Sequence, residues 1–405
     1  MAKKKAAAGK PAAKKTAKKK AAAGKPAAKK KVSAREAASK KRAKASEVLF
    51  ASVGFELAEA GQTLPKRFER LLDRLDFAPV MKDKRVAVKM HLGVGIGYTT
   101  IHPVFVRVLV QKIKEAGGKP FLTDVAGSVA SAAQRGYTEQ VLGAPLAATT
   151  GFKDRYFYPK PVSLNGLKEI QVAGEIHDAD VLVNLSHVKG HGCCGYGGAC
   201  KNIAMGCVTG PTRGGIHALE GGMTWDADKC THCEACIRAC RYGANKFKDD
   251  GTYTVFYHNC TYCMHCVAAC PEHAIAVDPG GFKVFQEGMA LSTKTVLDTF
   301  PPGAVFHINV LLQVTYLCDC WGFSTPALVP DVGIVASRDM VAIEKASLDL
   351  VDAPDVLPNS LPKGRELGTK GHLFERIHYK DPFVQLRALE RRGIGTQRYR
   401  LVEVK

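Results

Sequence analysis

Eight cysteines in the middle of the chain fall in two runs of identical spacing. Residues 230–240 and 260–270 each read Cys-x2-Cys-x2-Cys-x3-Cys, so the second run is the first shifted by 30 residues. In such a pattern, three cysteines of a run bind one 4Fe–4S cluster and the fourth binds the other cluster. The first predicted ligand set is Cys230, Cys233, Cys236 and Cys270, and the second is Cys240, Cys260, Cys263 and Cys266.

Small residues surround these cysteines, which suits iron–sulfur binding because backbone amides must approach the sulfides closely. They are Ala235, Ala239, Ala244, Ala268, Ala269 and Ala274. Pro271 follows the last cysteine, as in bacterial ferredoxins, whereas Arg241 takes that position in the first run. A zinc ribbon would instead use paired Cys-x2-Cys knuckles. The segment therefore resembles a bacterial two-cluster ferredoxin, and paired clusters favour electron transfer.

Candidate reactive side chains follow the strands predicted elsewhere in the chain. Lys89 lies in the strand at 85–90 and His91 follows it, but the glycines that come next do not form a dinucleotide-binding fingerprint. His187 and Lys189 follow the strand at 180–185. Histidine moves protons near neutral pH, and lysine binds anions by charge. We predict catalytic roles for the two histidines and anion binding by the two lysines; a structural hydrogen-bonding role is the alternative for each histidine.

A glycine-rich turn lies just beyond. Gly195, Gly197 and Gly198 precede a short helix expected to start near Ala199, and Lys201 lies in its first turn. A glycine turn that leads into a helix N-terminus can bind an anion. We predict that the three glycines bind an anionic group and that Lys201 acts on it. The alternative is a tight turn with solvated lysines.

Six further cysteines lie outside the two runs. They are Cys193, Cys194, Cys200, Cys207, Cys318 and Cys320. The Cys-x-Cys spacing of the last two argues against an intramolecular disulfide without strain, but it suits a metal. We hypothesise that Cys207, Cys318 and Cys320 form a third metal site or a reactive thiol site, the alternative being inert buried thiols. The Cys193–Cys194 pair is interpreted as incidental.

Apolar strands alternate with amphipathic helices outside the cysteine-rich segment. The predicted strands are 48–53, 85–90, 120–124, 180–185, 304–310 and 331–336, and the predicted helices are 64–75, 103–116, 339–352 and 382–392. This alternation predicts an α/β fold, a largely parallel sheet with helices on both faces, plus an inserted small α+β ferredoxin-like domain. The predicted domains are a tail at 1–46, a host domain at 47–222 and 282–405, and the insertion at 223–281.

Several separated sequence motifs resemble those of one protein family and occur in the same order along the chain. They are VAVKMHLG (86–93), GYGGACKNIAMGC (195–207), CDCWGFSTPALVPDVGIVASRD (318–339) and VAIEKASLDLV (341–351). Together they resemble domain-of-unknown-function family 362, a group of iron–sulfur-associated bacterial and archaeal proteins, over residues 47–355. The resemblance implies an α/β fold and cluster binding, and it implies no settled substrate. Cys193, Cys194, Cys200 and the tail depart from the family pattern.

The positive charge of the chain is concentrated in its first residues. The net charge is +20, and residues 1–45 hold 18 Lys or Arg and one acidic residue. The peptide at 3–15 recurs unchanged at 18–30 and predicts a disordered tail that attracts polyanions such as nucleic acid without specificity. Fourteen cysteines and the lack of a secretion signal or an apolar span predict a cytoplasmic protein without membrane contact.

Three functions are compatible with these features. The first is an iron–sulfur redox protein of the oxidoreductase class that binds two 4Fe–4S clusters and exchanges electrons with a small anionic substrate. The second is a ferredoxin-like carrier that serves an electron donor or acceptor protein and has no substrate of its own. The third is an iron–sulfur protein associated with nucleic acid through its tail.

Overall fold

The structure is a computed structural model that describes residues 45–278 and 281–405. The predicted basic tail, with its repeated peptide, falls on residues 1–46 and therefore lies outside the described residues except for its last two positions. None of the described helices is long and apolar enough to cross a lipid bilayer.

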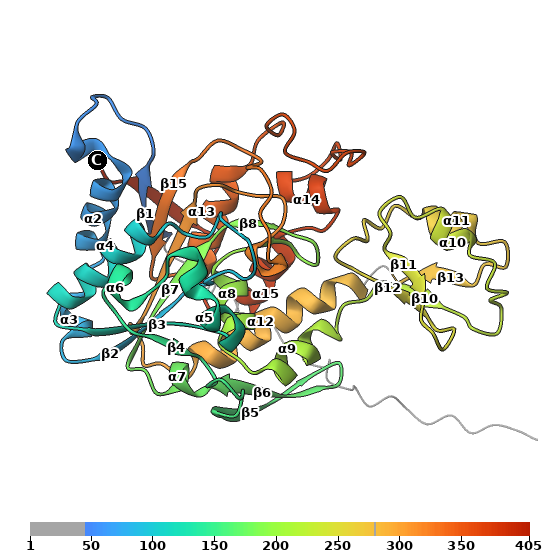
Figure 1. The fold of residues 1–405 in the computed structure, drawn as a ribbon, viewed down its shortest axis with the longest axis horizontal. Coiled ribbons are helices and arrows are strands. Elements are labelled where there is room, and N and C mark those ends of the chain that lie inside the picture. Colours follow the sequence, from blue (N-terminus) through green and yellow to red (C-terminus); the bar gives the residue numbers. More distant parts are fainter. Residues whose placement is uncertain (1–44, 279–280) are drawn as a thin grey trace, which may run out of the picture. The chain divides into compact units, whose positions relative to one another are not determined.

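An eight-stranded mixed sheet forms the centre of the host domain (Figure 1), in the order β16-β1-β15-β14-β7-β2-β3-β4. The strands are β1 Ser46–Ser52, β2 Arg85–Lys89, β3 Lys119–Asp124, β4 Leu146–Ala148, β7 Val181–His187, β14 Val305–Leu311, β15 Gly333–Ser337 and β16 Tyr399–Glu403. Only β15 runs antiparallel to its neighbours within this sheet. The predicted α/β class with a largely parallel sheet is confirmed.

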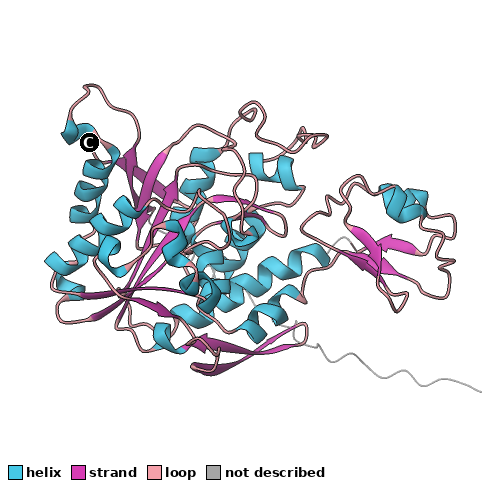
Figure 2. Cartoon of the chain, viewed as in Figure 1, coloured by secondary structure: helices cyan, strands magenta, loops and turns pink. Residues whose placement is uncertain are grey.

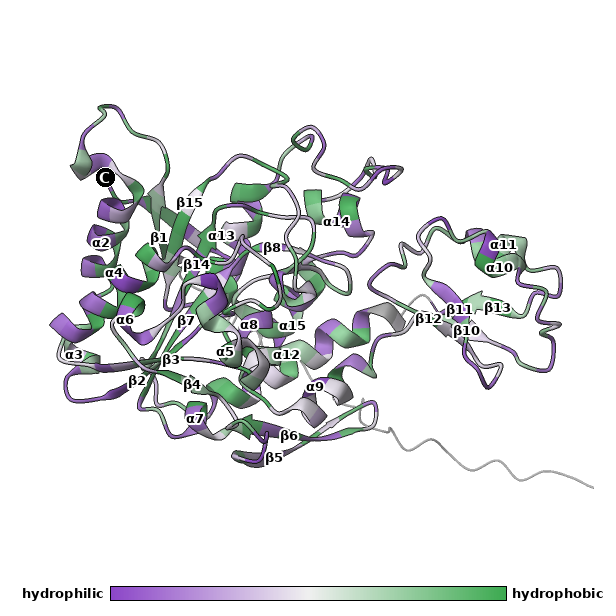
Figure 3. Ribbon diagram, viewed as in Figure 1, coloured by the Kyte–Doolittle hydropathy of each residue, from purple (hydrophilic) through white to green (hydrophobic). Residues whose placement is uncertain are grey.

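Helices pack on both faces of this sheet (Figure 2). The longer ones are α2 Leu64–Arg74, α4 Pro103–Glu115, α8 Ala199–Gly206, α12 Val284–Leu297, α13 Met340–Val351 and α15 Phe383–Arg391. On β7, Val183 packs in the core with α2 and α4, whereas Leu182 packs in the core with α8 and α12. Alternate residues of a strand face opposite sides, so both faces are buried. In Figure 3, α2 carries both hydrophilic and hydrophobic stretches, as a surface helix does.

Shorter elements complete the host domain. They are α3 Ala78–Met81, α5 Ala126–Ala130, α6 Glu139–Leu142, α7 Gly174–His177, α9 Gly210–His217, α14 Leu373–His378, the hairpin β5 Phe157–Leu164 with β6 Leu167–Ala173, and the ribbon β8 Lys189–His191 with β9 Gly195–Gly197. The ribbon follows β7 directly, so Lys189 and His191 lie just beyond the carboxyl end of that strand.

In the cysteine-rich insertion, predicted at 223–281, the elements among the described residues 223–278 are all short. They are β10 Met223–Trp225, α10 Ala235–Arg238, β11 Asn245–Phe247, β12 Tyr253–Val255, α11 His265–Ala269 and β13 Ile275–Val277. β10 pairs with β13 and β11 pairs with β12, both antiparallel. Its small core contains Cys236, Cys266, Tyr253 and Ile275. The insertion therefore repeats one strand–helix–strand unit.

Candidate metal centres and the neighbouring cavity

The first predicted ligand set surrounds one small cavity. Cys230, Cys233, Cys236 and Cys270 all line it, together with Trp225, Tyr253 and other residues of the insertion. Cys270 belongs to the second cysteine run, so the structure places it beside the first three cysteines of the other run. This arrangement is the crossed one that the spacing predicts.

The cysteines of the second predicted set lie close enough together to raise one another's pKa. Burial raises the pKa of Cys260, and the nearby thiolates of Cys266 and Cys240 raise it further. Burial also raises the pKa of Cys266, with added contributions from Cys240 and Cys263. Four thiols this close together suit the binding of a metal cation, because thiolates repel one another until a metal neutralises their charge.

The backbone of the insertion repeats its unusual conformations in both runs. Four non-glycine residues adopt positive φ at matching positions: His232 (54°), Tyr262 (52°), Glu234 (59°) and Met264 (68°). The amide of Ala244 donates to Cys240 Sγ at 3.2 Å, and the amide of Ala274 donates to Cys270 Sγ at 3.3 Å. Backbone amides directed at sulfur stabilise bound iron–sulfur clusters. The clustered cysteines are thus consistent with metal or iron–sulfur binding.

A cavity of about 520 Å³ lies in the host domain where β2, β3 and β7 end. The last residues of these strands, Lys89, Asp124 and His187, all line it. The other predicted site residues that line it are His91, Lys189, Gly197, Gly198, Lys201, Cys318 and Cys320. The carboxyl ends of parallel strands are the usual ligand position in such sheets. Most of the site residues predicted outside the two cysteine runs therefore meet at one place.

One side of the cavity holds a buried ion pair. Lys89 Nζ lies 3.0 Å from Asp124 Oδ1, and His91 Nδ1 lies 2.8 Å from Asp124 Oδ2. Although burial acts in the opposite direction, Lys89 and His91 lower the pKa of Asp124. Lys89 also donates to Asn202 Oδ1 at 2.8 Å. His91 Nε2 has no hydrogen-bond partner among the described residues, so Asp124 orients a ring whose second nitrogen remains available.

The opposite side holds a second buried ion pair, between Lys189 and Asp319. Burial lowers the pKa of Lys189 to about 8, although Asp319 opposes the shift. His187 Nε2 donates to Leu312 O at 2.6 Å, and its Nδ1 lies 3.4 Å from Asp319 Oδ2. Burial and the charge of Lys189 lower the pKa of His187. Both of its nitrogens are occupied, so this histidine is suited to positioning Asp319 and Lys189.

Lys201 is the lysine of the cavity that is not neutralised. It lies in the first turn of α8, 3.9 Å from Cys318 Sγ, and within the described ranges no carboxylate lies at ion-pair distance from it. The Cys200 amide at this helix start donates to Glu344 Oε1 at 2.7 Å. The predicted anion cradle at the helix N-terminus is therefore occupied by the carboxylate of Glu344, and positive charge reaches the cavity through lysine side chains instead.

Gly195 has a structural role apart from the cavity. It does not line the cavity, its φ is +83°, and a Cβ there would lie 2.6 Å from Lys380 O. Its lack of a side chain permits this close approach. Gly198 does line the cavity, and a Cβ on it would lie 2.5 Å from Glu344 Oε2.

The hypothesised third cysteine site is only partly assembled. Cys318 and Cys320 form a disulfide, whereas the sequence favoured a metal for this pair; the short helical turn at Asp319–Trp321 lies between the two cysteines. His191 is a possible ligand beside them, and its ligand atom lies within 4.8 Å of both sulfurs. Cys207 is fully buried, belongs to none of the ligand groups found among the described residues, and burial raises its pKa to about 12.

A loop of the insertion forms part of the cavity wall. Phe256 and His258 line the cavity, and Trp321 packs edge-on against both rings at 5.8 and 5.4 Å. The buried Lys380 donates to the carbonyls of Tyr257 at 2.9 Å and Cys260 at 2.7 Å. The cavity wall is therefore two residues from Cys260, a predicted cluster ligand. The cysteine spacing of the insertion does not predict this contribution to the cavity.

Comparison with known proteins places the chain in a family. Residues 86–349 match the family described as Domain of unknown function (DUF362), and the chain belongs to this family. The thylakoid-associated protein sll1697 of Synechocystis sp. is 32% identical over 125 residues, which cover 30% of this chain and 36% of that protein. The match thus spans little more than a third of that relative's length.

Two solved structures show a distant likeness. The lactate racemase apoprotein from Thermoanaerobacterium thermosaccharolyticum is 13% identical, with a TM-score of 0.32 over 60% of this chain and 49% of that chain. A protein from Thermotoga maritima is 12% identical, with a TM-score of 0.37 over 63% and 52% of the two chains.

Proposed function

We propose that this protein is an iron–sulfur redox protein whose insertion holds two 4Fe–4S clusters and exchanges electrons with a small anionic substrate in the host cavity. The clusters, when bound, would supply single electrons. The observation that carries the proposal is the composition of the cavity wall. It combines host lysines with Phe256 and His258, which lie close in the chain to Cys260.

The charge of the cavity favours an anionic substrate. Four cationic side chains line it, Lys89, Lys189, Lys201 and Arg213, against the two carboxylates of Asp124 and Asp319. Both carboxylates are already paired with lysines. A cleft with an excess of one charge concentrates ligands of the opposite charge. A substrate carboxylate or phosphate would therefore be held by Lys201 and Arg213.

Proton transfer is assigned to His91. Its Nδ1 faces Asp124, so the carboxylate fixes the tautomer and orientation of the ring. Its Nε2 is available to take a proton from a substrate or to give one up as electrons arrive. His187 would instead hold Lys189 and Asp319 in place, since both of its ring nitrogens have partners.

Anaerobic reconstitution tests the cofactor content. We expect about eight iron and eight acid-labile sulfide per chain from two cubane clusters. A colourless protein with zinc in the insertion cysteines would overturn the proposal.

A thermal-shift screen with small carboxylates and phosphates tests the substrate site. The reconstituted protein should be stabilised by at least one anion, and this stabilisation should be lost in Lys201→Met. Stabilisation by none of the anions would favour the carrier function. Comparing nucleic-acid binding with and without residues 1–45 tests the third function.

A further inference from the structure

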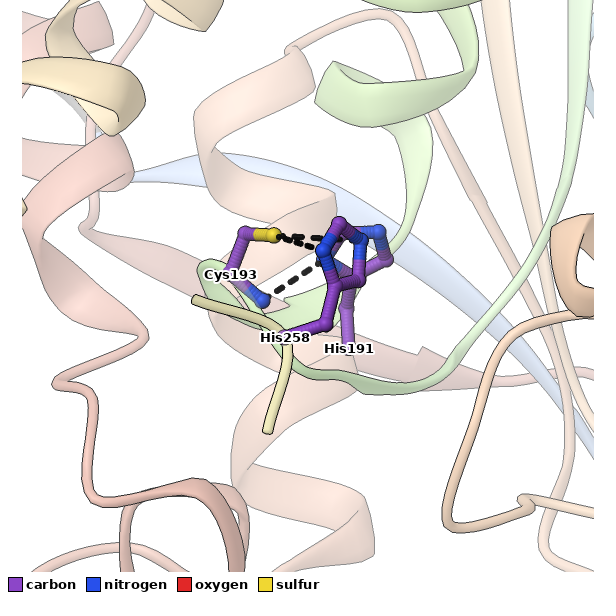
Figure 4. Close-up of side chains that lie close together, drawn as sticks. All are labelled: His191, Cys193 and His258. Atoms are coloured by element: carbon purple, nitrogen blue, oxygen red, sulfur yellow. Dashed lines mark hydrogen bonds between the residues drawn. The ribbon is translucent and has the colours of Figure 1, made fainter. Parts of the chain in front are cut away.

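A second group of metal-ligand side chains lies beside the cavity, outside the eight insertion cysteines. Cys193 Sγ lies 3.0 Å from Nδ1 and 3.1 Å from Nε2 of His258 (Figure 4). Ligand atoms of His191, Cys193 and His258 all lie within 4.8 Å of one another. His191 and Cys193 are buried, and His258 is half-buried. One thiol and two imidazoles thus converge on one point.

The backbone holds these three side chains together. Gly192 separates His191 from Cys193, and a Cβ on it would lie 2.5 Å from His258 O. The Cys193 amide donates to His191 Nδ1 at 3.2 Å, which places the ring beside Cys193; a metal bound by the ring would replace this hydrogen bond. Lys380 binds the carbonyl groups of Tyr257 and Cys260 on either side of His258. The host and the insertion therefore contribute to one preorganised group.

We propose that His191, Cys193 and His258 bind a mononuclear Zn²⁺ ion. Tetrahedral zinc with bonds of about 2.3 Å to sulfur and 2.0–2.1 Å to nitrogen separates these ligand atoms by about 3.6 Å. The distances of 3.0 and 3.1 Å between Cys193 Sγ and the His258 ring nitrogens reach about 3.6 Å with small side-chain rotations. Zinc accepts mixed thiolate and imidazole ligands. Binding releases one proton, because the Cys193 thiol must become a thiolate.

Glu220 is assigned the fourth position. Its carboxylate and the His217 ring form a second group with Cys193, again within 4.8 Å. His217 Nδ1 is hydrogen-bonded to Glu220, which is the arrangement that orients a ligand from outside the metal. Four protein ligands make a closed, structural type of zinc site. Because His258 comes from the insertion and the other ligands from the host, the ion would tie the two together at the cavity wall.

This inference does not depend on the clusters, because none of these side chains belongs to the two cysteine runs. Its test uses the full chain, purified and reconstituted without oxygen in the presence of Zn²⁺. Metal analysis should give about one zinc per chain in addition to the iron. X-ray absorption at the zinc edge should show one sulfur among nitrogen and oxygen neighbours, whereas zinc misplaced in the insertion cysteines would show four sulfurs.

Variants identify the ligands. Cys193→Ser and His258→Gln should each lower bound zinc at least tenfold while iron and sulfide stay unchanged. Cys200→Ser is the control, because Cys200 is also buried but hydrogen-bonds to Thr293, and it should retain zinc. The proposal is overturned if the iron-loaded wild type binds no zinc, if its zinc has four sulfur neighbours, or if zinc survives Cys193→Ser. If a variant fails to fold, X-ray absorption at the zinc edge of the wild-type protein still shows whether the ion has one sulfur neighbour or four.

Discussion

The cysteines of the insertion and those of the host domain differ in burial and in what positions them. In the insertion, burial follows the 30-residue repeat: Cys233 and Cys263 are exposed, Cys236 and Cys266 are buried, and the remaining four are intermediate. In the host, Cys193, Cys194, Cys200 and Cys207 are all buried among residues distant in sequence. Backbone conformation arranges the first set, whereas the tertiary fold arranges the second. Spacing is therefore informative about ligands only in the insertion.

The largest expected effect concerns crossed ligation. Cys230→Ala/Cys270→Ala removes two ligands of one cluster and should leave about four iron per chain, whereas Cys260→Ala/Cys270→Ala removes one ligand of each and should leave almost none. Iron and sulfide analysis after anaerobic reconstitution measures both. The host double variant Cys200→Ala/Cys207→Ala should keep about eight iron. If Cys260→Ala/Cys270→Ala kept about four iron and Cys230→Ala/Cys270→Ala kept almost none, each run would bind its own cluster.

The next effect concerns the charge of the cavity. Lys201→Met should weaken binding of the stabilising anion at least tenfold, because a hydrogen bond to a charged group contributes about 1.5–3 kcal/mol. Lys345→Met is the control, since Lys345 pairs with Asp349 on α13. Titration calorimetry measures both affinities. An equal loss in the two variants would mean that the cavity is not the binding site.

A smaller effect concerns the carboxylate at the start of α8. Burial raises the pKa of Glu344 to about 7, above about 4.3 in an unfolded chain. The folded state then holds this proton more tightly, so the contribution of Glu344 to stability is greatest below about pH 4.3 and is lost as the pH rises to about 7, by up to about 4 kcal/mol. Glu344→Gln should remove this fall, and its amide could donate to Asn309 Oδ1, which lacks a partner among the described residues.

Thermal midpoints at pH 5 and pH 8 measure this effect. The wild type should lose more stability between the two pH values than Glu344→Gln. Parallel pH profiles for the two proteins would show that Glu344 is not protonated in the folded state near neutral pH.

The smallest effect tests the symmetry of the insertion. Arg241 stands where Pro271 stands in the second run, and its own ion pair with Glu366 is exposed. Arg241→Pro should keep all the iron and change stability by no more than about 0.4–1 kcal/mol, because proline fits a backbone that its symmetry mate already adopts. A loss of iron would show that the two cysteine runs are not structurally equivalent. Iron analysis and the thermal midpoint measure the outcome.

Much of the host fold was predictable because its strands are buried on both faces. The six predicted strands and four predicted helices correspond to β1, β2, β3, β7, β14 and β15 and to α2, α4, α13 and α15. The hairpin β5–β6 was missed because most of its residues are exposed or half-exposed and lack a continuous apolar run. β16 was missed for the same reason; it joins the sheet beside β1 from the far end of the chain.

The candidate site was predicted only where a strand ending or a motif marked it. Asp124 ends the predicted strand 120–124, much as Lys89 lies at the end of the predicted strand 85–90, and that signal could have identified it. Asp319 lies within the Cys-x-Cys string. No local signal marks Arg213 or His258, since they reach the cavity through packing of distant segments. The pairing of Cys193 with His258 spans 65 residues and depends on the fold alone.

The pairing of β10 with β13 has a consequence for how this chain could be rebuilt. Met223 lies directly opposite Val277, so the chain leaves the host and returns to it at adjacent points, about 5 Å apart for paired strands. A loop of a few residues could bridge that gap. The whole segment could therefore be removed without separating the chain ends that remain in the host domain. Another domain whose termini lie close together could be inserted in its place.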